Sequence, residues 1–172
     1  NEPLVLSLNG AWGTGKTFIL QRWQHELKNE EFEAIYFNAW EDDFCSNPLL
    51  AIIGQLYEEL QQQKFQNLLD EISRNAKPLL KKTALNLVSN ATQGVLNYNE
   101  SDFETTEEEL LKQYQDSRKE KRALRKSCEE LAQKVYEWTD NPLIFIIDEV
   151  DRCRPTFAIE LLEQVKNIFD LE

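Results

Sequence analysis

The sequence has 172 residues and a net charge of −12 at pH 7, which argues against a general nucleic-acid binder because phosphate backbones attract basic surfaces. Hydrophobic residues make up 41% and charged residues 29%, a balance typical of one globular domain. Cys45, Cys128 and Cys153 lack metal-binding spacing, which favours reduced thiols in a cytoplasmic protein. No apolar run is long enough to predict a membrane span, and peripheral contact with a membrane stays open.

Short apolar runs alternate with amphipathic segments in the first half of the chain. Residues 3–8, PLVLSL, form an apolar run that stops at Asn-Gly and predicts a buried strand. From Gly15 to about Lys28 the apolar residues recur at helical spacing, which predicts a helix packed on a sheet. Residues 32–40, FEAIYFNAW, predict a second strand. The Asn-Pro pair at 47–48 then opens a long helix with an N-cap and a proline in its first turn.

The second half predicts long helices followed by one buried strand. Pro78 is expected to end one helical stretch and to begin another. Residues 97–106 predict an acidic loop, and a capping box at 106–109 begins a charged helix that runs to about residue 138. The continuous apolar run LIFIID at 143–148 is typical of a strand buried in a parallel sheet. A last helix begins at Pro155.

The loop NGAWGTGKT fits the pattern G-x-x-x-x-G-K-[ST] at Gly10, Gly15, Lys16 and Thr17. In such a loop, backbone N–H groups and the start of the following helix bind phosphate oxygens. The lysine reaches the β- and γ-phosphates, and the threonine hydroxyl ligates Mg²⁺. A predicted strand precedes the loop and a predicted helix follows it, so the sequence predicts a nucleotide site.

An acidic pair follows the last predicted strand. Asp148 ends the apolar run and is placed to hold Mg²⁺, directly or through water. Glu149 stands where many P-loop ATPases keep the general base, although Asp151 is close enough to share that role and a salt-bridged Glu149 stays an alternative. There is no N-K-x-D segment to read guanine, and no D-x-x-G at Asp148. ATP is therefore the favoured nucleotide.

Strands that alternate with helices predict an α/β fold, a P-loop-type parallel sheet flanked by helices. The segment between the second and third predicted strands is far longer than a parallel crossover needs, so we expect a helical insertion of about 70 to 90 residues. We assign residues 1–47 and 139–172 to the nucleotide-binding core and residues 48–138 to the helical insertion.

Three separated blocks, WGTGKT, FNAWED and IIDEVDRCRP with the ELLEQVKNIF that follows it, resemble the KAP family of P-loop NTPases. The blocks cover about 1–60 and 139–172. The family includes bacterial phage-exclusion proteins and a large animal membrane scaffold. The resemblance implies an ATPase of the additional-strand class in which Asp148 and Glu149 complete the hydrolytic site. It also implies a cradle for ATP and Mg²⁺ in the loop; the expected cofactor-binding residues are Gly10, Trp12, Gly13, Thr14, Gly15, Lys16, Thr17 and Phe18.

The chain departs from the family's usual pattern at two places. Many relatives have Asp-Asp where this chain has Asp148-Glu149, a change that keeps the charge. Many carry transmembrane helices in the insertion, but residues 78–96 are here too polar to span a membrane. In that class a further strand, later in sequence, lies between the P-loop strand and the Asp148 strand. We therefore expect a sheet that is incomplete at Glu172, with the sensor residue and any arginine finger outside this chain.

The leading hypothesis is an ATP-hydrolysing switch or motor domain, and the family resemblance suggests phage defence. In it Thr17 and Asp148 organise Mg²⁺, Lys16 neutralises phosphate charge, and Glu149 orients the attacking water. The chain alone is expected to hydrolyse ATP poorly. The alternative is a nucleotide-gated scaffold with little or no hydrolysis, whose helical insertion binds a protein partner. A small-molecule kinase is less favoured because no acceptor pocket or arginine-rich lid is recognisable.

Several side chains have two interpretations. Trp12 and Trp40 either shape the rim of the site or pack in the core, and core packing is favoured. Arg152 and Arg154 form either local salt bridges or contacts with a neighbouring subunit. The basic run at 118–126 is interpreted as a solvated helix face, with contact to nucleic acid or lipid head groups as the less favoured alternative. The oligomeric state stays open.

Overall fold

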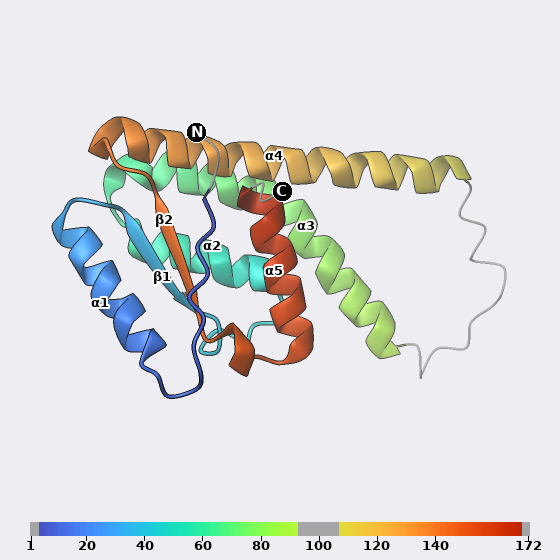
Figure 1. The fold of residues 1–172 in the computed structure, drawn as a ribbon. Coiled ribbons are helices and arrows are strands. Elements are labelled where there is room, and N and C mark those ends of the chain that lie inside the picture. Colours follow the sequence, from blue (N-terminus) through green and yellow to red (C-terminus); the bar gives the residue numbers. More distant parts are fainter. Residues whose placement is uncertain (1–3, 93–106, 170–172) are drawn as a thin grey trace.

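The computed structural model describes residues 4–92 and 107–169 of the chain (Figure 1). The elements in chain order are α1 (Lys16–Asn29), β1 (Ala34–Asn38), α2 (Pro48–Glu59), η1 (Gln63–Phe65), α3 (Gln66–Thr92), α4 (Glu107–Thr139), β2 (Ile144–Asp148), η3 (Val150–Arg152) and α5 (Pro155–Phe169). The expected acidic loop at 97–106, which includes the first residue of the capping box, lies outside the described residues.

The two strands pair in parallel. Their register runs from Ala34 opposite Ile144 to Asn38 opposite Asp148. Most residues of both strands are isoleucine or aromatic, types that favour a pleated, covered surface. A mixed α/β fold with a small parallel sheet flanked by helices is therefore confirmed, and both strands end at the same edge of the sheet.

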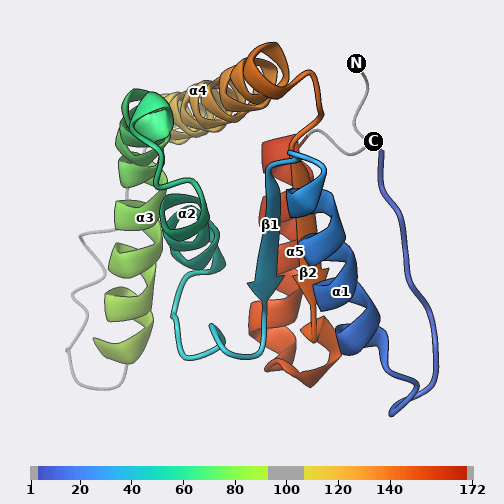
Figure 2. The same ribbon diagram turned by 90° about the vertical axis from the view of Figure 1, so that its left-hand side faces the viewer.

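The prediction of a buried strand over residues 3–8 is wrong for its described part. Residues 4–8 form no strand, and all of their side chains are exposed. An apolar run becomes a strand only where a neighbouring strand offers hydrogen-bond partners. Within the described ranges the sheet consists of β1 and β2 alone, and Figure 2 shows the N-terminal segment apart from both.

Alternation along β1 separates two buried clusters. Ala34 packs with Leu27 of α1 and Ile146 of β2, so α1 covers one face of the sheet. Ile35 and Phe37 point to the other face, and α1 and α2 accordingly lie on opposite sides of the strands (Figure 2). The larger cluster joins that face to residues of the other helices, among them Leu49, Ile52, Leu56, Leu69, Ile72, Leu131, Val135, Phe157 and Leu161. The division into a core and a helical insertion stays a prediction.

The helices α3 and α4 pack along each other through buried apolar residues and a polar pair, the half-buried Asn75 and the buried Ser127. Asn75 donates a 2.6 Å hydrogen bond to the Ser127 hydroxyl, which itself donates to the carbonyl of Ala123. The expected helix boundary at Pro78 is wrong, because α3 continues through this residue. A proline inside a helix removes a backbone bond and bends it, and the last part of α3 diverges from α4 (Figure 1).

Two predictions drawn from composition concern the state of the cysteines and the presence of membrane-spanning helices. The cysteines are free, with Cys128 and Cys153 buried, as expected for reduced thiols. Across the described stretches of the chain, none of the helices combines the length and apolarity that crossing a membrane requires.

We predict that Leu131→Ala lowers the free energy of unfolding by about 2–5 kcal/mol, because it leaves a cavity in the larger cluster. Leu131 is 1% exposed. Leu111→Ala is the matched control on the same helix, and since Leu111 is 57% exposed its effect should stay within about 0.5 kcal/mol. Urea denaturation measures both. Equal losses would show that α4 does not pack on the core at Leu131.

Candidate functional site

The glycine-rich loop turns sharply just before α1. Gly13 and Gly15 have φ angles of 79° and 86°, in the left-handed region where a side chain is strained. The Thr14 hydroxyl closes the turn by donating a 2.8 Å hydrogen bond to the carbonyl of Ala11. Gly15 is also the N-cap of α1 and supplies no side-chain cap. The first N–H groups of this helix therefore point toward the space in front of the loop, as in anion-binding helix termini.

Lys16 lies across this loop. Its ammonium donates hydrogen bonds of 2.9 Å to the carbonyl of Gly10 and 3.3 Å to that of Ala11. The following residue, Thr17, is half-buried in the first turn of α1. A cation and a hydroxyl thus stand at the same helix N-terminus as the uncapped N–H groups.

Asp148 ends β2 and is buried at 7% exposure. Both of its oxygens accept hydrogen bonds, since the Tyr36 hydroxyl donates to Oδ2 at 2.8 Å and the Glu149 backbone N–H donates to Oδ1 at 2.8 Å. Burial, reinforced by the Asp148 carboxylate, raises the pKa of the Tyr36 phenol. The phenol is therefore protonated at neutral pH and acts as a donor.

Glu149 has a left-handed backbone with φ 58° and ψ 26°. Its side chain is 11% exposed, and Oε1 lies 3.0 Å from Nη1 of Arg152. The Arg152 guanidinium in turn lies over the ring of Trp40, with 5.5 Å between Cζ and the ring centroid. In this structure the predicted base is thus ion-paired, and the arginine that holds it rests on an aromatic face.

The loops that follow the two strands are also tied together by Arg154. Its backbone N–H donates to Oδ2 of Asp43 at 3.0 Å, and its Nε donates to Oδ1 at 2.9 Å. The guanidinium also donates to the backbone carbonyl of Asp43 and to that of Cys45. The Arg154 backbone and side chain together lower the pKa of the Asp43 carboxyl. Arg152 and Arg154 therefore both make local ion pairs.

One cleft of about 390 Å³ joins most of the predicted residues. It is lined by Trp12, Gly13, Gly15, Lys16, Thr17, Phe18, Gln21, Asp148, Glu149, Asp151 and Arg152. Gly10 and Thr14 do not line it, but both take part in hydrogen bonds within the loop. The favoured core packing of the tryptophans is wrong, because Trp12 is 84% exposed and Trp40 is 51% exposed. Trp12 lines the cleft, whereas Trp40 does not line it but packs against Arg152, which does.

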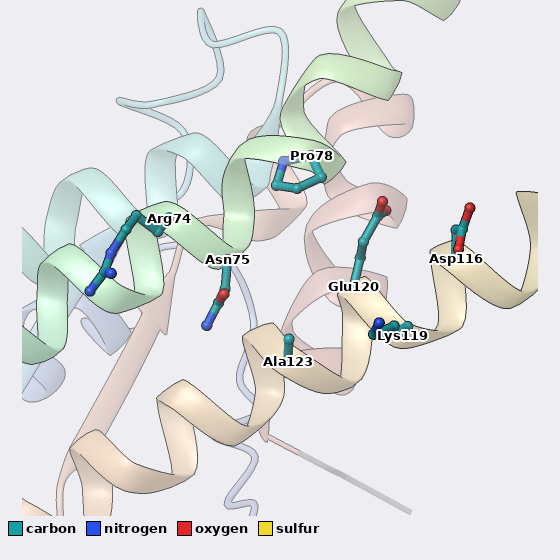
Figure 3. Close-up of a pocket in the computed structure, with 7 residues that line it drawn as sticks. All are labelled: Arg74, Asn75, Pro78, Asp116, Lys119, Glu120 and Ala123. Carbon is teal, nitrogen blue, oxygen red and sulfur yellow. The ribbon is translucent and has the colours of Figure 1, made fainter.

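Sequence reasoning missed three residues of this region. Gln21 lines the cleft and follows Thr17 by one helical turn, a spacing that could have indicated it. Tyr36 reaches Asp148 from β1, and Arg152 was noted only as a flanking charge. A second cleft of about 330 Å³ lies between α3 and α4, lined by Arg74, Asn75, Pro78, Asp116, Lys119, Glu120 and Ala123 (Figure 3). None of the predicted site residues belongs to it.

The donor set of the first cleft fits a hard cation. Thr17 of α1 offers a hydroxyl oxygen and Asp148 of β2 a carboxylate, and both residues line the same cleft. Mg²⁺ takes one or two carboxylates and completes its shell with water and phosphate oxygens. A helix N-terminus with a lysine on one side and a strand that ends in acids on the other is the arrangement of a P-loop nucleotide-binding protein.

Comparison with known proteins identifies the family. The chain belongs to the KAP family, since the model for the KAP family P-loop domain matches residues 1–172. The match confirms the resemblance and also covers the middle of the chain, where no motif had been recognised. Membership implies nucleotide binding. Curated proteins and solved structures gave no match.

Because Glu149 has a left-handed backbone, we predict that glycine is more stable than alanine at this position, the reverse of the usual order. Glu149→Gly should be more stable than Glu149→Ala by about 0.5–1 kcal/mol, because the left-handed penalty of about 1–2 kcal/mol exceeds the entropy cost of glycine. Both variants lose the ion pair with Arg152, so only the backbone differs.

The matched control pair is Asp151→Gly and Asp151→Ala, because Asp151 has no positive φ. At that position alanine should be the more stable residue. Denaturant unfolding of the four variants measures the two differences. The same order at both positions would contradict the strained backbone at Glu149.

Proposed function

We propose that this chain binds ATP with Mg²⁺ in the first cleft and forms the hydrolytic site of an ATPase. The proposal rests on one observation: Lys16 and Thr17 at the start of α1 line the same cleft as Asp148 and Glu149 at the end of β2. These four side chains come from segments more than a hundred residues apart in sequence. They supply a cation, a hydroxyl and two carboxylates, which phosphoryl transfer to water requires.

Binding would begin with the loop and the helix. The uncapped N–H groups of α1 donate to phosphate oxygens, and Lys16 exchanges its bonds to the carbonyls of Gly10 and Ala11 for bonds to phosphate. Thr17 and Asp148 hold the metal, directly or through water. When bound, Mg²⁺ neutralises charge on the phosphates. The exposed rings of Trp12 and Phe18 border the cleft and belong to the cofactor-binding set that we propose.

Glu149 would act on the attacking water. Arg152 holds Oε1, and we assign the second oxygen, Oε2, to the water's proton. A positioned general base contributes about 10²–10⁴-fold to such a step. The left-handed turn at Glu149 brings its side chain back toward the cleft that Asp148 and Lys16 line.

The proposal also concerns the helices between β1 and β2. We propose that residues 48–138 are a helical insertion in a nucleotide-binding core of 1–47 and 139–172. The ion pair between Arg154 and Asp43 would couple the insertion to the core, because Asp43 lies shortly before α2 and Arg154 follows the acidic pair Asp148-Glu149. A switch or motor role, including one in phage defence, is proposed from family membership.

We predict that Lys16→Ala weakens ATP binding by about 10- to 100-fold, since a hydrogen bond to a charged group contributes about 1.5–3 kcal/mol. Isothermal titration calorimetry with Mg²⁺ and ATP measures the loss. Lys166→Ala on α5 is the matched control, because its side chain is exposed and does not line the cleft. Unchanged affinity in Lys16→Ala would remove the loop from the binding site.

We predict that Glu149→Gln keeps ATP binding but lowers kcat about 10²–10⁴-fold, the contribution of a general base. Phosphate release by the full-length protein at saturating ATP measures the effect. Asp151→Asn is the paired variant, because Asp151 also lines the cleft. If Asp151→Asn loses turnover and Glu149→Gln does not, the base is Asp151.

A second candidate is a nucleotide-gated scaffold with little or no hydrolysis. It is favoured by the first turns of α4, which extend past the other described helices (Figure 1) and expose Leu111 and Tyr114. Single-turnover measurements with the full-length protein separate the candidates. Tight ATP binding without phosphate release over hours would support the scaffold and overturn the ATPase.

A further inference from the structure

We propose that Tyr36 is a positioning residue that fixes the Asp148 carboxylate for Mg²⁺. The inference rests on the proposed function, because it concerns the metal that accompanies ATP. Tyr36 itself lies beside the cleft and does not line it. Its effect on the metal would pass through Asp148.

The register of the sheet explains why Tyr36 reaches Asp148. Tyr36 is paired with Ile146, and Asp148 is the next residue of β2 on the same face. Such diagonal neighbours are within reach of an aromatic side chain. The ring of Tyr36 packs on the cluster of Leu27, Ala34 and Ile146. Packing therefore holds the ring, and the hydroxyl alone extends to the edge of the sheet.

The hydroxyl and a backbone group together set the orientation of the carboxylate. Tyr36 donates to Oδ2 and the Glu149 N–H donates to Oδ1, each at 2.8 Å. With one bond on each oxygen, rotation of the carboxylate group would break at least one of them. Each ionised oxygen has a second lone pair for a metal or its water. Partners of this kind orient metal ligands, and removing one typically costs about 10–100-fold in metal affinity or activity.

The single phenolic proton of Tyr36 is donated to the Asp148 carboxylate. This bond links β1 to the strand that bears the proposed metal-binding carboxylate.

The test is Tyr36→Phe, which removes one hydroxyl and keeps the packed ring. ATP binding is measured by calorimetry across a Mg²⁺ titration and again in EDTA. We expect the Mg²⁺ concentration for half-maximal stimulation of binding to rise by about 10-fold or more, with ATP affinity in EDTA unchanged.

Tyr57→Phe is the matched control. Tyr57 donates a 2.9 Å hydrogen bond to Oδ1 of Asp70, between α2 and α3, so this variant removes the same kind of bond outside the cleft. Its Mg²⁺ dependence should equal that of the wild type. A thermal melt of each variant shows whether it is folded. If Tyr36→Phe unfolds, Tyr36→Leu, which also removes the hydroxyl and keeps an apolar side chain on the same cluster, provides the measurement, and an unchanged Mg²⁺ dependence there overturns the proposal.

A double-mutant cycle with Asp148→Asn shows whether Tyr36 acts through Asp148. The Tyr36→Phe shift should disappear in the Asp148→Asn background. A shift of the same size in both backgrounds, or wild-type Mg²⁺ dependence in Tyr36→Phe, overturns the inference and leaves the proposed function intact. Wild-type protein whose ATP binding does not respond to Mg²⁺ overturns the proposed metal site together with the inference.

Discussion

The in-register parallel pairing of β1 and β2 is the constraint on which the site depends. It places Asn38 opposite Asp148, and the N–H of Ala39 continues the ladder by donating to the Asp148 carbonyl at 3.0 Å. Both strands therefore deliver their following loops to one edge, where ligands of parallel α/β sheets bind. A slip of one residue would turn Tyr36 to the other face and separate it from Asp148.

Beyond that edge, two arginines from one short segment hold the loops together in different ways. Arg152 lies between the Glu149 carboxylate and the face of Trp40. Arg154 instead donates hydrogen bonds to both the side chain and the backbone of Asp43. The first contact concerns the acid proposed as the base, and the second concerns the entry to α2. A rearrangement at the end of β2 would therefore be transmitted to the helices between the strands.

The sequence predicted those parts of the fold that local chemistry determines. The glycine pattern indicated the loop and Lys16, and the apolar run before Asp148 indicated β2, because each signal lies within a few neighbouring residues. The strand expected at 3–8 was wrong because strand formation depends on a neighbour that composition does not reveal. Tyr36 was missed for the same reason: its contact with Asp148 depends on the register between segments 112 residues apart, which periodicity along one strand cannot supply.

The bonds of Lys16 have a consequence for the heat of nucleotide binding. The ammonium already has two carbonyl partners, Gly10 and Ala11, within the free loop. Phosphate would therefore replace existing bonds of Lys16 instead of adding to an unsatisfied charge. The enthalpy contributed by this lysine is the difference between two sets of partners, and it is smaller than a count of bonds in the complex would suggest. The shape of the free loop therefore depends on the same Lys16 ammonium that phosphate would draw away from the loop carbonyls.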